Sequence, residues 1–175
     1  MKNFATVYWL LPANAERELF DDVVGILANQ FNAPKFVPHL TLFSGSEIKD
    51  KNVARRLLIE MRTGGVGLDV REVTFSSEFT KTLFVRFEPS PHLKEFATKL
   101  AHVVNSPAKG PADPHLSLLY KKLPSATKEE LASTIQLPFR TVIFDSLAAV
   151  RCVSPSRTKA DVESWEILAT TVLPP

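Results

Sequence analysis

Two five-residue segments of the chain repeat the same order of histidine, leucine and hydroxyl side chains. They are Pro38-His39-Leu40-Thr41-Leu42 and Pro114-His115-Leu116-Ser117-Leu118. In a β-strand, side chains at positions i and i+2 point to the same face, so each segment would present an imidazole beside a hydroxyl. The leucines between them would point to the opposite face, into the core. Each segment is therefore predicted to be a short strand that holds a histidine and a hydroxyl in place.

If both segments border one cleft, two imidazoles and two hydroxyls surround a single point. Histidine has an ordinary pKa near 6.5, so one neutral ring can take a proton from water while a second, protonated ring gives one to a leaving oxygen. The hydroxyls of Thr41 and Ser117 can donate to phosphate oxygens whose negative charge grows in the transition state. The groups suit hydrolysis of a phosphodiester, with His39 and His115 as the acid–base pair.

Other arrangements of the histidines are weaker. A third Pro-His-Leu, at 91–93, has lysine instead of a hydroxyl two residues after its histidine and opens a predicted helix. His92 and His102 are both expected in that helix, outside any site. Of the four residues two positions away from His39 and His115, only Asp113 is of a type that binds metals. We therefore expect no metal and no other cofactor.

The composition limits the class of protein. The 175 residues suffice for one domain over 1–175, and a net charge of +2 is too balanced for a protein whose main partner is long nucleic acid. The single cysteine, Cys152, cannot form an internal disulfide and is expected to be a small buried hydrophobe, which favours a cytoplasmic protein. No apolar run is long enough to cross a membrane. A monomer that binds a small molecule is expected.

Helical and strand periodicities divide the chain into short alternating elements. The predicted order is an N-terminal strand, a helix capped by Asn14, a strand over 38–43, a helix over 50–62, a hairpin of strands over 67–76 and 81–88, a helix opened by Ser90-Pro91, a strand over 115–120, a short helix with a capping box at 127–130, and strands over 138–150 and 163–172. Each half contains one histidine–hydroxyl strand. This order predicts an α+β fold of two related lobes that face each other.

The two motifs resemble the His-x-Thr/Ser-x pair that defines the 2H phosphoesterase superfamily, and the resemblance covers nearly the whole chain. Within it, residues 115–120 and 162–166 are most similar to plant and yeast-type cyclic phosphodiesterases. The resemblance implies a bilobal fold of two facing antiparallel sheets with outer helices and a central cleft. It also implies metal-independent hydrolysis of ADP-ribose 1″,2″-cyclic phosphate and nucleoside 2′,3′-cyclic phosphates. By motif match, His39 and His115 would be the catalytic pair, Thr41 and Ser117 the phosphate binders, and Tyr120 a residue near the cleft rim. Of the pair, we expect His115 to be the base and His39 the acid, although the pseudo-symmetry of the motifs makes the two roles nearly interchangeable.

Residues outside the motifs give further candidates for substrate contact. Tyr120 and Phe84 could stack on a nucleotide base, although an alternating strand around Phe84 is equally consistent with a core position. Arg151, Arg157 and Lys159, expected together in a late loop, could meet a diphosphate or be solvated.

Two alternative functions would use the same four motif residues. A 2′–5′ RNA ligase-like protein or an RNA-end cyclic phosphodiesterase would act on a longer substrate, but such a protein needs a continuous basic strip, and the net charge of +2 argues against one. A non-catalytic nucleotide-binding module would keep the fold without the reaction, yet both motifs are intact. The expected partner is a small cyclic phosphate nucleotide.

Overall fold

Seven strands and five α-helices alternate along the chain in a computed structural model that describes residues 1–175. They are β1 (Phe4–Pro12), α1 (Asn14–Phe31), β2 (Leu40–Gly45), α2 (Lys51–Ile59), β3 (Val66–Phe75), the 3₁₀ turn η1 (Phe79–Lys81), β4 (Leu83–Phe87), α3 (Pro91–Val103), β5 (His115–Leu119), α4 (Ser125–Thr134), β6 (Thr141–Val153), α5 (Lys159–Glu163) and β7 (Glu166–Val172). The predicted order of elements is confirmed, apart from α5, which was predicted only as loop and strand.

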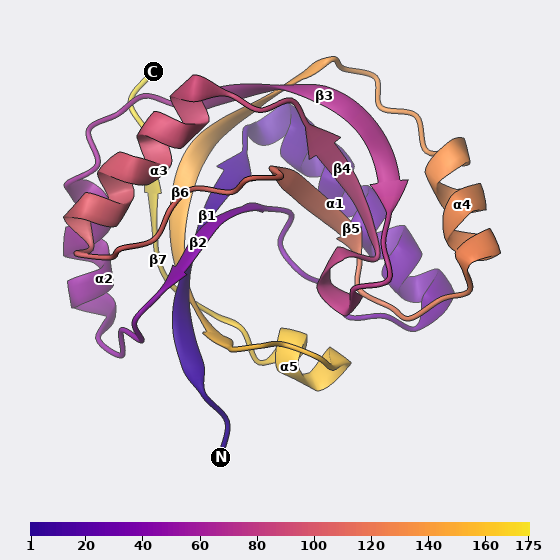
Figure 1. Cartoon of the computed structure of the whole chain (residues 1–175), viewed down its shortest axis with the longest axis horizontal. Coiled ribbons are helices and arrows are strands. Elements are labelled where there is room, and N and C mark those ends of the chain that lie inside the picture. Colours follow the sequence, from indigo (N-terminus) through magenta and orange to yellow (C-terminus); the bar gives the residue numbers. More distant parts are fainter.

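The strands form one strongly curved antiparallel sheet in the order β1-β2-β5-β4-β3-β6-β7 (Figure 1). Because β6 also pairs with β1, six strands close into a ring and β7 is added outside it. The expected α+β fold with outer helices and a cleft is confirmed, but the two facing sheets that were expected are parts of one sheet. Hydrogen bonds between β2 and β5, and between β3 and β6, join the two halves into a continuous sheet.

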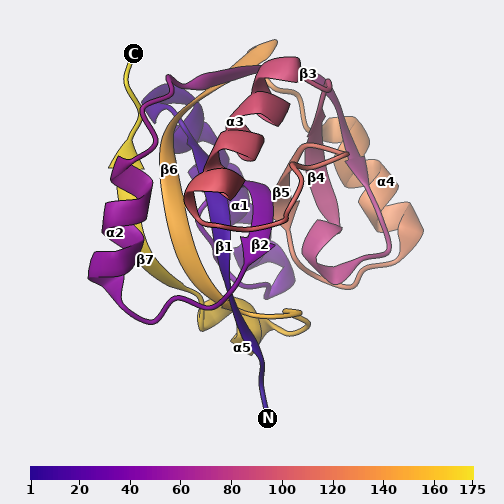
Figure 2. The same ribbon diagram turned by 60° about the vertical axis from the view of Figure 1, so that its left-hand side comes forward.

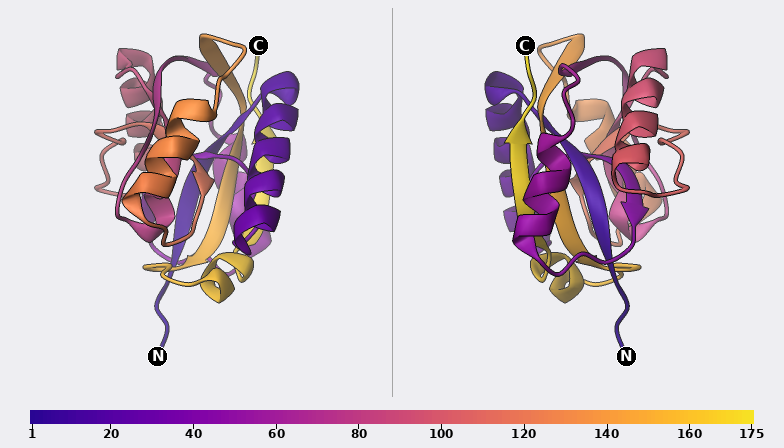
Figure 3. Two further views of the ribbon diagram at one scale, coloured as in Figure 1. Left: turned by 90° about the vertical axis from the view of Figure 1, so that its right-hand side faces the viewer. Right: turned by 90° about the vertical axis from the view of Figure 1, so that its left-hand side faces the viewer.

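The helices lie around this sheet (Figure 2). Figure 3 shows α1 and α4 on one side of the molecule and α2 and α3 on the other, with α5 at the end from which the N terminus extends. Each of the two long helices buries an apolar face: α1 buries Phe20, Val24 and Leu27, and α3 buries Leu93 and Phe96. No helix combines the length and the apolar character needed to cross a membrane.

Strand β1 supplies apolar side chains to both of its faces. Tyr8 and Leu10 belong to the main core, whereas Trp9 and Leu11 belong to a second, smaller cluster that includes Cys152. The alternation follows from the two-residue period of a strand. The second cluster lies on the face of β1 and β6 that borders the cleft described below.

Two helix starts differ from the prediction. Helix α1 follows Ala13 and Asn14 makes no cap, while α4 begins at Ser125 after Pro124, whose fixed backbone angle suits the position before a helix. The predicted capping box at 127–130 is therefore wrong. A capping box does occur before α5, where Thr158 and Asp161 exchange side chain–backbone hydrogen bonds.

Candidate active site

The two histidine–hydroxyl motifs lie on adjacent strands, β2 and β5. The strands pair antiparallel at a single register position, Leu40 opposite Leu116, which is the equivalent residue in each motif. Both leucines are fully buried in the main core. The side chains on the other face, His39, Thr41, His115 and Ser117, all line one cavity of about 380 Å³. The predicted alternation thus brings the four residues together, on neighbouring strands related by a local twofold axis.

Each histidine is oriented by the backbone two residues before it. The Nδ1 atom of His39 lies 2.6 Å from the carbonyl oxygen of Val37, and that of His115 lies 2.8 Å from the carbonyl oxygen of Asp113. A carbonyl oxygen only accepts, so Nδ1 carries the hydrogen in both rings. This leaves Nε2 of each ring as the atom that can exchange a proton in the cavity.

Burial favours the neutral form of both rings. Desolvation lowers the pKa of His39 to about 4, against the opposing effect of the hydrogen bond to Val37. Desolvation also lowers the pKa of His115, and the nearby positive charge of Lys81 adds to the decrease. Both rings therefore accept a proton less readily than an ordinary imidazole, and a nearby negative charge would oppose this effect.

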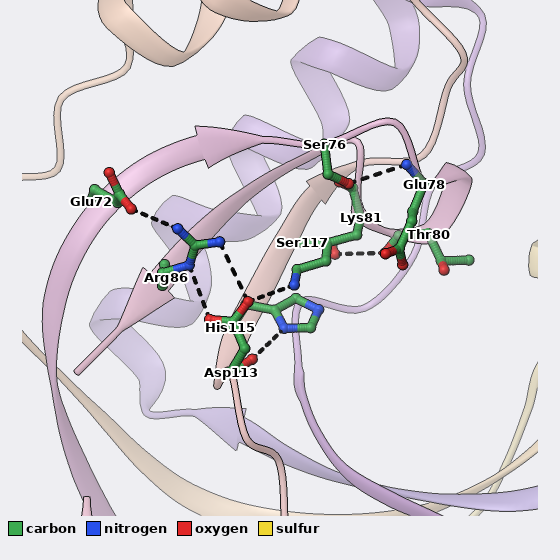
Figure 4. Close-up of polar contacts among 9 residues, drawn as sticks. All are labelled: Glu72, Ser76, Glu78, Thr80, Lys81, Arg86, Asp113, His115 and Ser117. Carbon is green, nitrogen blue, oxygen red and sulfur yellow. Dashed lines mark hydrogen bonds and ion pairs between the residues drawn. The ribbon is translucent and has the colours of Figure 1, made fainter. Parts of the chain in front are cut away.

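The two hydroxyls differ in their present partners. Ser117 Oγ donates to the carbonyl oxygen of Thr80 at 3.0 Å (Figure 4). Since no buried side-chain nitrogen or oxygen atom lacks a partner, and Thr41 makes no hydrogen bond within the protein, its hydroxyl faces solvent in the cavity. The Thr41 hydroxyl is free to donate to a ligand, whereas the Ser117 hydroxyl must first break its hydrogen bond to the Thr80 carbonyl oxygen.

A network of charged side chains surrounds His115 (Figure 4). The carboxylate of Asp113 accepts from Lys81 Nζ at 2.6 Å and from Arg86 Nε at 2.9 Å, and Arg86 also pairs with Glu72 at 2.7 Å. Burial disfavours ionisation of Asp113, but its hydrogen bonds with Lys81 and Arg86 outweigh that effect and hold its pKa below the ordinary value. The residue whose carbonyl orients His115 is thereby fixed by two cations.

Aromatic side chains surround His39. The ring of Trp9 stacks on His39 with centroids 3.7 Å apart and planes 10° from parallel, and Trp165 meets both rings edge-on. Trp9 reaches the cavity because it pairs with Thr41 across β1 and β2, and cross-strand neighbours share a face. The sequence did not indicate Trp9 and Lys81 as cavity residues, and Trp165 was considered only as part of the segment 162–166 that resembles cyclic phosphodiesterases.

The predicted base-stacking residues have different positions. Tyr120 lines the cavity but is buried, with its ring stacked on Phe36 at 4.0 Å. The prediction for Phe84 is wrong: it shares the cleft face with Ser117, yet its ring is fully buried beneath Lys81 and is absent from the cavity wall. Cations cover its π face, so no base can stack there.

The late basic residues also separate. Arg151 belongs to β6, where it pairs with Glu47 at 2.7 Å and stacks on Phe4, so it does not lie in the expected loop. Arg157 and Lys159 are exposed before and at the start of α5. Cys152 is buried in the cavity wall, as expected, and burial raises the pKa of its thiol to about 12.

Comparisons with known proteins agree with this architecture. The sequence model of the family described as "Cyclic phosphodiesterase-like protein" matches residues 4–173. The cyclic phosphodiesterase of Arabidopsis thaliana is 25% identical over 173 residues, which cover 95% of this chain and 94% of that protein. Among solved structures, E. coli LigT in its apo form superposes with a TM-score of 0.56 at 18% identity, covering 99% of both chains. The complex of LigT with 3′-AMP gives 0.54 at 16% identity, covering 97% of this chain and 98% of that one.

Proposed function

The chain belongs to the cyclic phosphodiesterase-like family, a family of enzymes within the 2H phosphoesterase superfamily, and we propose that it hydrolyses small cyclic phosphodiesters with His39 and His115 as acid–base pair. The observation that carries the proposal is the pair of Nδ1 hydrogen bonds to backbone carbonyls. They leave both Nε2 atoms to exchange protons at one cavity that also contains two hydroxyls. The arrangement can deliver one proton and remove another around a single phosphorus atom.

The reaction forms one bond to phosphorus and breaks one. Water loses a proton to the neutral ring and its oxygen attacks phosphorus. The bond from phosphorus to one ring oxygen breaks, and that oxygen takes a proton from the protonated ring. The product is a phosphomonoester with a free hydroxyl beside it. Because the two imidazoles supply both proton transfers, no metal ion is needed for either step.

We propose His115 as the base and His39 as the acid. The positive charge of Lys81 disfavours protonation of His115, which suits a ring that must start neutral. The substrate's own negative charge offsets the burial of His39 and favours its protonated form.

The hydroxyls and the cavity size fit the remaining parts of such a substrate. Thr41 can donate directly to a non-bridging phosphate oxygen, and Ser117 can do so by exchanging its bond to Thr80. A cavity of about 380 Å³ has the size of a small-molecule site. We propose ADP-ribose 1″,2″-cyclic phosphate and nucleoside 2′,3′-cyclic phosphates as substrates.

The test is hydrolysis of these compounds in the presence of EDTA by the wild-type protein and by His39→Ala and His115→Ala. Each variant should lose about 10²- to 10⁴-fold in kcat, the usual contribution of one general acid or base. His92→Ala is the matched control, because this histidine follows proline and precedes leucine as the others do but is exposed on α3. Its rate should equal that of the wild type.

Three results would contradict the proposal in different ways. Activity lost with EDTA would exclude the metal-free reaction. Activity confined to 2′–5′-linked oligonucleotides would indicate the RNA-directed alternative. Tight binding of cyclic nucleotides without turnover would indicate a binding module.

A further inference from the structure

A second hollow adjoins the candidate active site. Tyr120 lines both the cavity that contains the two histidines and this hollow, so the two share a wall. The hollow is formed by segments far apart in the sequence: the residues after α1, the turn η1, the residues after β5, and the segment before and at the start of α5. The fold therefore brings separate parts of the chain together beside the cleft.

The charges around the hollow are all positive. Four of its lining residues are basic, Lys121, Lys122, Arg157 and Lys159, and none is acidic. The first three form no salt bridge within the chain, and Lys159 reaches Glu163 only at 3.8 Å. A concave surface lined by four cations, three of them without a counter-charge, attracts anions.

The basic residues on the cleft side behave differently. Lys81 and Arg86 both pair with Asp113 at distances under 3 Å, and Arg151 pairs with Glu47 at 2.7 Å. Three basic side chains that form no salt bridge, Lys121, Lys122 and Arg157, thus lie together in the hollow. Their guanidinium and ammonium groups are the usual partners of phosphoryl oxygens.

We propose that this hollow binds a second, unreactive phosphoryl group of the substrate while the cyclic phosphate lies between His39 and His115. The inference rests on the proposed function and narrows it to nucleotides that carry a cyclic phosphate and at least one further phosphate. Four cations gathered in a single hollow fit one short phosphoryl group, whereas an RNA backbone would need a continuous basic strip. From the sequence, Arg151, Arg157 and Lys159 could meet a diphosphate. The hollow contains Arg157 and Lys159 together with Lys121 and Lys122, but not Arg151.

The test compares adenosine 2′,3′-cyclic phosphate with the same nucleotide bearing a 5′-phosphate or a 5′-diphosphate. The wild-type protein should show a lower KM for the phosphorylated forms. Lys122→Gln and Arg157→Gln should each reduce this KM preference about two- to fivefold, the effect of one exposed charge pair, and the double variant should reduce it further. Lys109→Gln, which removes an exposed lysine from a distant loop, should leave the preference intact. The preference should also weaken with added salt.

Equal KM values for all three substrates in the wild-type protein would overturn the inference, as would variants that raise every KM alike. A lower KM seen only with oligonucleotides that end in a cyclic phosphate would refute the assignment to small nucleotides. Calorimetry with inorganic pyrophosphate separates this inference from the proposed function, because it needs no turnover. Pyrophosphate binding that is lost in the double variant but kept in His39→Ala supports a phosphoryl site in the hollow, even if no cyclic phosphate is hydrolysed. A wild-type protein that does not bind pyrophosphate would contradict this site.

Discussion

His39 should make the folded protein sensitive to acid. Desolvation lowers its pKa from the ordinary 6.5 to about 4, because the ring is buried between Trp9 and the strand. Between these two pH values, the unfolded chain binds a proton that the folded chain does not. The free energy of unfolding is therefore unaffected by this group above pH 6.5 and decreases as the pH falls towards 4. Each pH unit in that window costs about 1.4 kcal/mol, or about 3 kcal/mol in total.

A loss of this size is a large part of the 5–15 kcal/mol typical of a folded domain. It can be measured by urea unfolding at pH 7, 5.5 and 4.5 for the wild-type protein and His39→Gln, which removes the titrating group. Carboxylates titrate in both proteins, so they cancel when the two pH curves are subtracted. The wild-type curve should fall below that of the variant, by about 3 kcal/mol as the pH approaches 4. Parallel curves would show that burial does not hold His39 neutral and would refute the reasoning.

Two further substitutions test the surroundings of the cleft, and a third tests the packing of the fold. Trp9→Leu should expose one face of His39 to water and raise its pKa towards 6.5, which an NMR titration of the ring would detect; an unchanged pKa would contradict the role assigned to stacking. Arg86→Gln removes one of the two cations that hold Asp113, whose carbonyl orients His115, and should lower kcat by up to about 10²-fold. An unchanged kcat would mean that Lys81 alone holds Asp113 in place. Gly65→Ala should destabilise the fold by about 1–3 kcal/mol in thermal unfolding, because its Cβ would lie 2.7 Å from a backbone oxygen; Gly25→Ala, with nothing within 4 Å, should not, and equal effects would refute the packing argument.

The sequence predicted those features that depend on local periodicity. Strand alternation predicted that Leu40 and Leu116 point into the core while His39 and His115 point the other way, and the structure has this arrangement. The order of strands and helices and their apolar faces were also predictable, since each is expressed within about ten residues. Hence the α+β class and the four motif residues of the cleft follow from the chain alone.

Features that depend on pairing between distant segments could not be predicted in this way. Trp9 lies in the cavity only because β1 pairs with β2, and Lys81 because the turn η1 brings it over His115. Phe84 has the correct face, but the cations that cover its ring come from its own strand and the preceding turn. Local alternation specifies which way a side chain points and leaves open what lies above it.

The pairing of Leu40 with Leu116 bears on the regiochemistry of ring opening. Because equivalent residues pair across the local twofold axis, the two histidines stand in nearly interchangeable positions relative to a phosphorus atom between them. A five-membered cyclic phosphate offers two ring oxygens, and under the proposed mechanism either one could be expelled. The choice between the two isomeric products would then be made by the unsymmetrical walls, Trp9 beside one histidine and Lys81 beside the other, as they fix the rest of the nucleotide. Under this mechanism, selectivity is a property of the binding surface, and it could change during evolution without any change in the two histidines.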